Sequence, residues 1–127
     1  MNLKTMFTIS FVFFLLLGLG FVLFPEFALT QSGVDPDNNI ILVTRELGAV
    51  TLGFAVISWM ARSAGPSKAR DGIVAAIVLT SVVLGIVDAL AIVSGVSSST
   101  NWVFVAISAL LAIGFAVTGR AAMASGS

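Results

Sequence analysis

The chain has 127 residues, of which 58% are hydrophobic and 9% charged, and its formal net charge is zero. About 25% of the residues in a soluble globular protein are charged, so this composition is typical of a protein that lies in a lipid bilayer. Cysteine, histidine and tyrosine are absent, which excludes disulfides, thiolate metal sites and the commonest general base. The zero net charge argues against nucleic-acid binding, which requires a concentrated basic surface.

Four long apolar segments follow one another along the chain, and we expect each to be a transmembrane helix: 6–24, 40–60, 73–93 and 102–118. At ~1.5 Å per residue the first three can cross ~30 Å of hydrocarbon, and the fourth is slightly shorter. None alternates apolar with polar residues as a barrel strand would. Because every connection is short, the sequence predicts an all-α integral membrane protein, a single four-span domain over 1–127 folded as an up-down-up-down four-helix bundle.

The ends of these segments carry their own signals. The first could be read as a signal peptide, with Lys4 as its basic residue and cleavage near Ala28, but its apolar run is longer than a ~7–15 residue signal core, so we favour a retained helix. Asp35 and Pro36 predict the start of the second helix. The stretch 64–67, which contains glycine and proline, is expected to separate the second helix from the third.

The basic residues outside the spans all fall at one end of the expected bundle: Lys4, Arg62, Lys68, Arg70 and Arg120. The first loop at the other end is acidic, with Glu26, Asp35 and Asp37. Lysine and arginine are enriched in cytoplasmic loops. We therefore predict a multi-pass protein of the cytoplasmic (inner) membrane with both termini in the cytoplasm.

Three charged residues lie inside the predicted spans: Arg45 and Glu46 in the second, and Asp88 in the third. Counting from the basic end, Arg45 and Asp88 are at the same depth on helices that follow one another, which predicts an ion pair between them. Two interpretations remain open. The three residues could form a polar site that binds a head group or relays protons, or the pair could fix helix register while Glu46 reaches the membrane surface.

Small residues repeat every four positions on two of the spans. Ser81, Gly85 and Ala89 do so on the third span, and Ser108, Ala112 and Ala116 on the fourth. Small residues at this spacing let helices approach closely, so both stripes are expected to be packing seams. At the basic end, Arg62, Lys68 and Arg70 are candidate contacts for lipid head groups, although topology alone would also explain them.

The pattern of Arg45, Gly48, Leu52-Gly53, Trp59 and Arg62 resembles that of the small four-span bacterial membrane proteins related to DoxX. DoxX itself is associated with quinol oxidation as an accessory subunit. The resemblance implies a four-span architecture, and it offers no residue-level catalytic motif.

Function is predicted only by class. We expect a non-enzymatic membrane protein without a cofactor or metal, acting as an accessory subunit or lipid-interacting component. Its expected partners are the lipid bilayer and either another membrane protein or further copies of itself, with no nucleic acid. The alternative is a small oligomeric transporter or channel that uses Arg45, Glu46 and Asp88.

Overall fold

The computed structural model describes residues 2–126, which form helices and connecting loops without a strand in that range. The all-α class is thereby confirmed. Four helices are long, and a short helix and a 3₁₀ turn lie in the connections between them: α1 (Leu3–Leu23), α2 (Pro25–Gln31), α3 (Asn38–Ala61), α4 (Lys68–Val93), η1 (Ser99–Asn101) and α5 (Trp102–Ser125).

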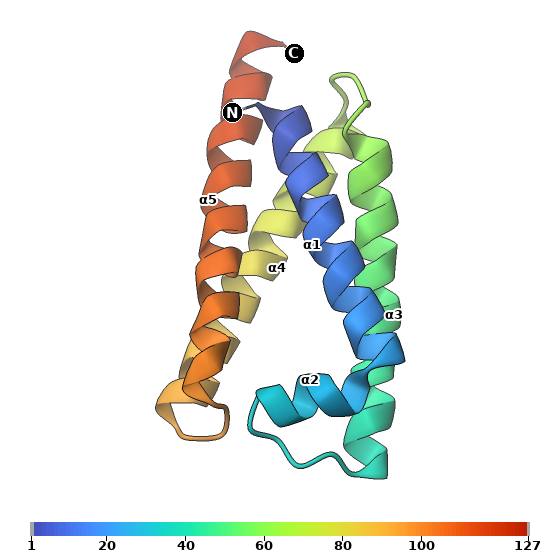
Figure 1. The fold of residues 1–127 in the computed structure, drawn as a ribbon. Coiled ribbons are helices and arrows are strands. Elements are labelled where there is room, and N and C mark those ends of the chain that lie inside the picture. Colours follow the sequence, from blue (N-terminus) through green and yellow to red (C-terminus); the bar gives the residue numbers. More distant parts are fainter. Residues whose placement is uncertain (1, 127) are drawn as a thin grey trace.

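The four long helices alternate in direction, so that both chain ends lie at the same end of the molecule (Figure 1). All four are long and apolar enough to cross a membrane, as expected for a multi-pass membrane protein. We call the end that carries the termini and the α3–α4 loop the basic end, and the opposite end the α2 end. At the α2 end, the short helix α2 lies across the long helices (Figure 1).

Helix boundaries differ from the sequence expectation at the α2 end. The α2 helix was not predicted, because its seven residues are too short to show a hydrophobic period. The N-cap of α3 is Asp37, whose Oδ1 accepts a hydrogen bond from the amide of Ile40 at 2.9 Å, so the predicted start at Asp35 was two residues early. At the basic end, the predicted break is present, and Ser67 caps α4 by accepting from the amide of Arg70 at 3.1 Å.

Helices α1 and α3 pack together along one seam. Gly18 and Gly48 are buried where the two backbones approach, and a Cβ added to Gly48 would lie 3.0 Å from the Gly18 carbonyl oxygen. Closer to the basic end, Ser10 Oγ donates to Ser58 Oγ at 2.8 Å, and both serines are fully buried. The seam therefore combines close glycine contact with one buried hydrogen bond between the helices.

Helices α4 and α5 form the second packed pair. Ser81 and Ser108 are buried between them, and a Cβ added to Gly85 would lie 3.4 Å from Ser108 Cβ. The predicted seam on the third span is therefore a contact with α5. The expectation for the fourth span is correct at Ser108 and Ala112, which are buried, and wrong at Ala116, which is exposed.

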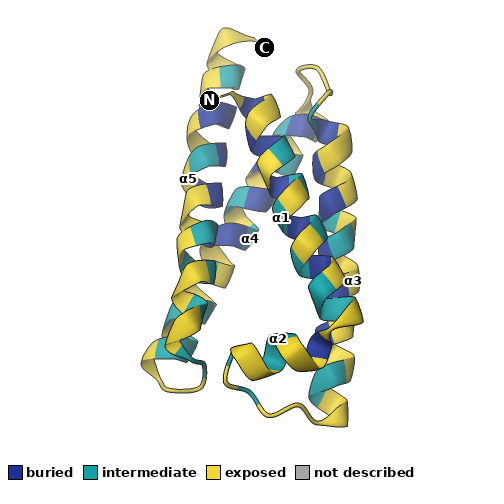
Figure 2. Cartoon of the chain, in the orientation of Figure 1, coloured by how far each residue is buried: buried dark blue, intermediate teal, exposed yellow. Residues whose placement is uncertain are grey.

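The hydrophobic core lies towards the basic end, where the two pairs meet. Phe7 of α1 and Phe115 of α5 are almost completely buried, and their rings meet edge to face with centroids 5.1 Å apart. Beyond Ser81, α4 has no buried residue, and α5 has none before Ser108. Figure 2 shows the buried faces turned inward near the basic end, while the two pairs separate towards α2. The molecule thus consists of two helical hairpins whose side chains pack together at the basic end.

The connection that contains α2 bridges the hairpins at their separated end. The amide of Ser98, between α4 and α5, donates to the Ser32 carbonyl at 2.9 Å, and Ser98 Oγ donates to the Gln31 carbonyl at 3.0 Å. These bonds join the end of α2 to the loop of the other hairpin. Hydrogen bonds between loops therefore hold the α2 end, whereas side-chain packing holds the basic end.

Candidate functional site

The three charged residues inside the spans do not converge. Arg45 and Glu46 lie on the exposed side of α3, whereas the neighbouring Thr44 and Gly48 are buried. Asp88 is half-buried on α4. Counting residues along the chain predicted their approximate depth, but the rotation of each helix about its axis separates them.

The predicted ion pair between Arg45 and Asp88 is absent from the part of the chain that the structure describes, and this prediction was wrong. It assumed that α3 and α4, being consecutive, pack side by side. Instead α3 packs mainly on α1 and α4 mainly on α5. As Figure 1 shows, α3 and α4 separate on the way from their connecting loop to the α2 end, where both charged residues lie. Consecutive helices need not be packing partners.

A pocket of about 460 Å³ opens at the basic end, where all four long helices contribute side chains. Its base includes Leu3 and Phe7 of α1, both buried in the core. Its mouth is polar. The lining residues are Asn2, Leu3, Lys4, Phe7, Ala61, Arg62, Ala64, Arg70, Thr118, Ala121, Ala122 and Ser125.

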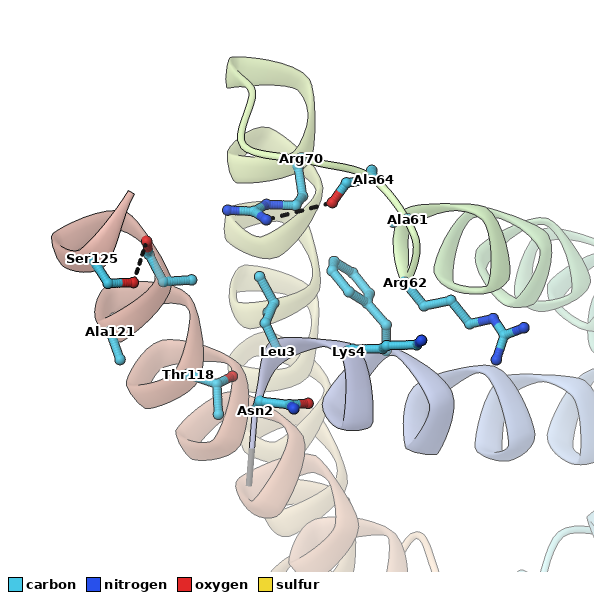
Figure 3. A pocket seen from close by; sticks show the side chains of 12 residues that line it. Asn2, Leu3, Lys4, Ala61, Arg62, Ala64, Arg70, Thr118, Ala121 and Ser125 are labelled. Carbon is cyan, nitrogen blue, oxygen red and sulfur yellow. Dashed lines mark hydrogen bonds between the residues drawn. The ribbon is translucent and has the colours of Figure 1, made fainter. Parts of the chain in front are cut away.

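Arg70 is the most enclosed charged residue of this pocket, with only 7% of its surface exposed. It lies in the first turn of α4, which Ser67 caps, so its backbone position is well defined. Its Nη1 donates to the Ala64 carbonyl at 3.5 Å, and Figure 3 shows the guanidinium turned towards the side of α5. An arginine held so deeply supplies a fixed positive charge where water is scarce.

Lys4 and Arg62 lie at the rim of the same pocket. The Arg62 guanidinium carbon is 3.5 Å from the centroid of the Trp59 ring, and the Trp59 ring is 4.7 Å from that of Phe11. This stacking holds the Arg62 side chain against Trp59 of α3. In Figure 3, Lys4 and Arg62 extend in the same direction, away from Arg70. The pocket therefore has one enclosed cation and two cations at its rim.

Among the described residues that line the pocket there is no aspartate or glutamate. Lys4, Arg62 and Arg70 therefore line one pocket, with Arg70 enclosed and the other two at its rim. Guanidinium and ammonium groups in such a setting favour phosphate or carboxylate groups, which accept charge-assisted hydrogen bonds. The arrangement suits an anion whose attached apolar part can contact Leu3 and Phe7.

The chain belongs to a family described as a domain of unknown function (DUF8292). The family model matches residues 1–121, a range that includes Lys4, Arg62 and Arg70. No curated protein and no solved structure matches the chain. Nothing in these comparisons ties it to DoxX or to a bacterial source.

Sequence reasoning found part of this pocket. Arg62 and Arg70 were predicted head-group contacts and line the pocket, whereas Lys68 is exposed and does not line it. Lys4 was considered as the basic residue of a signal peptide and as a sign of orientation, and it was not predicted to be a site residue. The signal that could have identified it was available, because helices that alternate in direction bring residues near the N-terminus to the same end as the loop between the second and third spans.

Proposed function

We propose that this chain is a non-enzymatic, lipid-interacting membrane protein that binds the head group of an anionic phospholipid in the pocket at the basic end. The observation that carries the proposal is the placement of Lys4, Arg62 and Arg70 around one pocket of about 460 Å³. Basic pockets between transmembrane helices are a recurring means of holding anionic head groups. The apolar base formed by Leu3 and Phe7 suits the glycerol and the first carbons of the acyl chains.

The charge distribution supports an orientation for this site. Under the positive-inside rule, the basic end and both termini face the cytoplasm, and the protein resides in the cytoplasmic (inner) membrane. The cytoplasmic leaflet carries anionic lipids that attract basic residues. The resemblance to DoxX relatives adds an accessory role to the proposal, in which the lipid-bound protein assists another membrane protein.

The proposal is tested by titrating the purified protein in detergent with phosphatidylglycerol or phosphatidylcholine and counting bound lipids by native mass spectrometry. We expect phosphatidylglycerol to bind more tightly. Since a basic residue near an anionic surface contributes about 1 kcal/mol, Lys4→Gln or Arg62→Gln should weaken its binding about fivefold. These two rim residues are preferred for the test because replacing the enclosed Arg70 could also unfold the protein.

Lys68→Gln is the matched control, because Lys68 is at the same end but outside the pocket. It should leave phosphatidylglycerol binding unchanged. Equal binding of the two lipids, or an equal loss in Lys68→Gln and Arg62→Gln, would overturn the proposal. The melting temperature of each variant shows whether it remains folded.

The alternative function, a small oligomeric transporter or channel, has a specific requirement in this fold. Arg45 and Glu46 lie on the exposed side of α3, so they can line a conduit only if another chain packs there. Mass measurement in lipid nanodiscs tests this, and a monomer would count against transport.

A further inference from the structure

A second hollow lies on the α4–α5 hairpin, separate from the pocket at the basic end. It is a groove of about 510 Å³ lined by residues of these two helices only. Most of the lining is aliphatic or aromatic, and among the described residues the charged ones that line it are Asp71 and Arg120. The apolar lining residues are Val74, Ala75, Val78, Leu79, Val82, Phe115, Ala116 and Met123.

The length of the groove corresponds to one leaflet of a bilayer. Along α4 its lining runs from Asp71 to Val82, which is about 16 Å at ~1.5 Å per residue. The hydrocarbon core of a bilayer is ~30 Å thick, so a groove of this length that starts at the basic end would reach about the middle of the membrane. An acyl chain of a lipid from one leaflet covers this distance, whereas a transmembrane helix of a partner would continue beyond it.

The two charges lie at the end of the groove where a lipid head group would be. Asp71 is half-buried in the first turn of α4, and Arg120 is exposed near the end of α5. No ion pair joins them within residues 2–126. A carboxylate and a guanidinium that line one groove without neutralising each other are complementary to a ligand that carries both a cation and an anion.

We propose that this groove binds a zwitterionic phospholipid with a primary ammonium group, such as phosphatidylethanolamine. The Asp71 carboxylate accepts charge-assisted hydrogen bonds from the ammonium, and Arg120 donates to the phosphate. One acyl chain lies along the apolar lining. The site differs from the pocket at the basic end in lining residues and in charge, and it would exist even if that pocket bound no lipid.

The test uses native mass spectrometry of the full chain in detergent, titrated with phosphatidylethanolamine or phosphatidylglycerol. The loss of one charge-assisted contact corresponds to roughly a tenfold change in affinity. Asp71→Asn should therefore weaken phosphatidylethanolamine binding about tenfold and leave phosphatidylglycerol binding unchanged or stronger. Arg120→Gln should weaken phosphatidylethanolamine binding to a similar extent.

A pair of alanines on α5 tests whether the acyl chain occupies the groove. Ala116 lines the groove, whereas Ala109 lies outside it, and both are exposed. Ala116→Phe should fill the groove and reduce phosphatidylethanolamine binding, while Ala109→Phe should not. Because neither side chain is buried, both variants are expected to fold.

Two results would overturn this proposal. One is Asp71→Asn binding phosphatidylethanolamine as tightly as the unmodified chain, and the other is equal binding in the two phenylalanine variants. Lys4→Gln and Arg62→Gln separate this proposal from the first one. These two variants should weaken phosphatidylglycerol binding without changing phosphatidylethanolamine binding. Each proposal can therefore be contradicted without affecting the other.

Discussion

Arg45 and Glu46 are adjacent in a helix long enough to span a membrane, and both side chains are exposed. Their depth explains why this is tolerated. A Cβ on Gly48 would touch Phe21 and Val22, near the end of α1, and Arg45 lies about one turn closer to the α2 end. At that level a charge costs less than at the bilayer centre, and an arginine side chain can reach the membrane surface. Neither residue needs a partner on α4.

The separation of Arg45 from Asp88 leads to a prediction about energetic coupling. Arg45→Leu and Asp88→Leu should change the free energy of unfolding independently, so the double variant should equal the sum of the single variants within about 0.5 kcal/mol. Thermal or denaturant unfolding in detergent measures all three. Coupling of more than about 1 kcal/mol would show that the two side chains meet.

At the scale of the elements, two hairpins pack by different means. The α1–α3 pair depends on Gly18 and Gly48, where backbone atoms approach closely. In the α4–α5 pair, a Cβ on Gly85 would be in ordinary contact with Ser108 at 3.4 Å, whereas a Cβ on Gly119 would lie 2.7 Å from Val74 Cγ1, a side-chain atom rather than backbone. A glycine at a helix crossing is therefore essential only where a backbone or a Cβ atom lies opposite it.

Two glycines of α3 make this argument testable. A Cβ at Gly48 would lie 2.9 Å from Phe21 Cβ and 3.0 Å from the Gly18 carbonyl oxygen, which cannot move without shifting α1. Gly48→Ala should therefore lower the free energy of unfolding by about 1–3 kcal/mol. Gly53 has nothing within 4 Å, so Gly53→Ala should be neutral or stabilise the helix.

The measurement is unfolding of both variants in the same detergent. Equal stabilities would contradict the packing of α1 against α3 through Gly18 and Gly48. Because both substitutions place an alanine in the same helix, the difference between them removes the contribution of intrinsic helix propensity.

At the scale of the whole molecule, the two hairpins share a core at the basic end and are joined by hydrogen-bonded loops at the other. This asymmetry places the termini, the α3–α4 loop and the pocket with Lys4, Arg62 and Arg70 together (Figure 1). The better-packed end therefore also carries the basic residues. The α2 end depends on contacts such as that between Ser98 and Ser32.

The arrangement of the four spans predicts the sidedness of the chain. Reporters fused before the first residue and after the last should lie on the same side of the membrane, and the positive-inside rule makes that side the cytoplasm. A reporter inserted near Ser32, in the loop at the α2 end, should lie on the opposite side. Termini found on opposite sides would contradict a four-span arrangement.

The sequence by itself determined the helical class, the number of long helices and their approximate limits, because these depend on local composition and on the length needed to cross a bilayer. It also indicated small-residue seams such as that of Gly85, since side-chain size is a local property. Two members of the candidate lipid pocket, Arg62 and Arg70, could be selected from the clustering of basic residues at one end.

Only the tertiary structure decided which helices pair and which side chains share a space. The sequence placed Arg45 and Asp88 at one depth, but contact also depends on the rotation of each helix and on the choice of neighbour. The close packing of α1 with α3 and of α4 with α5 determines both the rotation of each helix and its neighbour, and it separates these two charges. The same packing brought Lys4 to the pocket of Arg62 and Arg70 and placed Asp71 and Arg120 in one groove. Such contacts join residues far apart in the chain, so no local pattern specifies them.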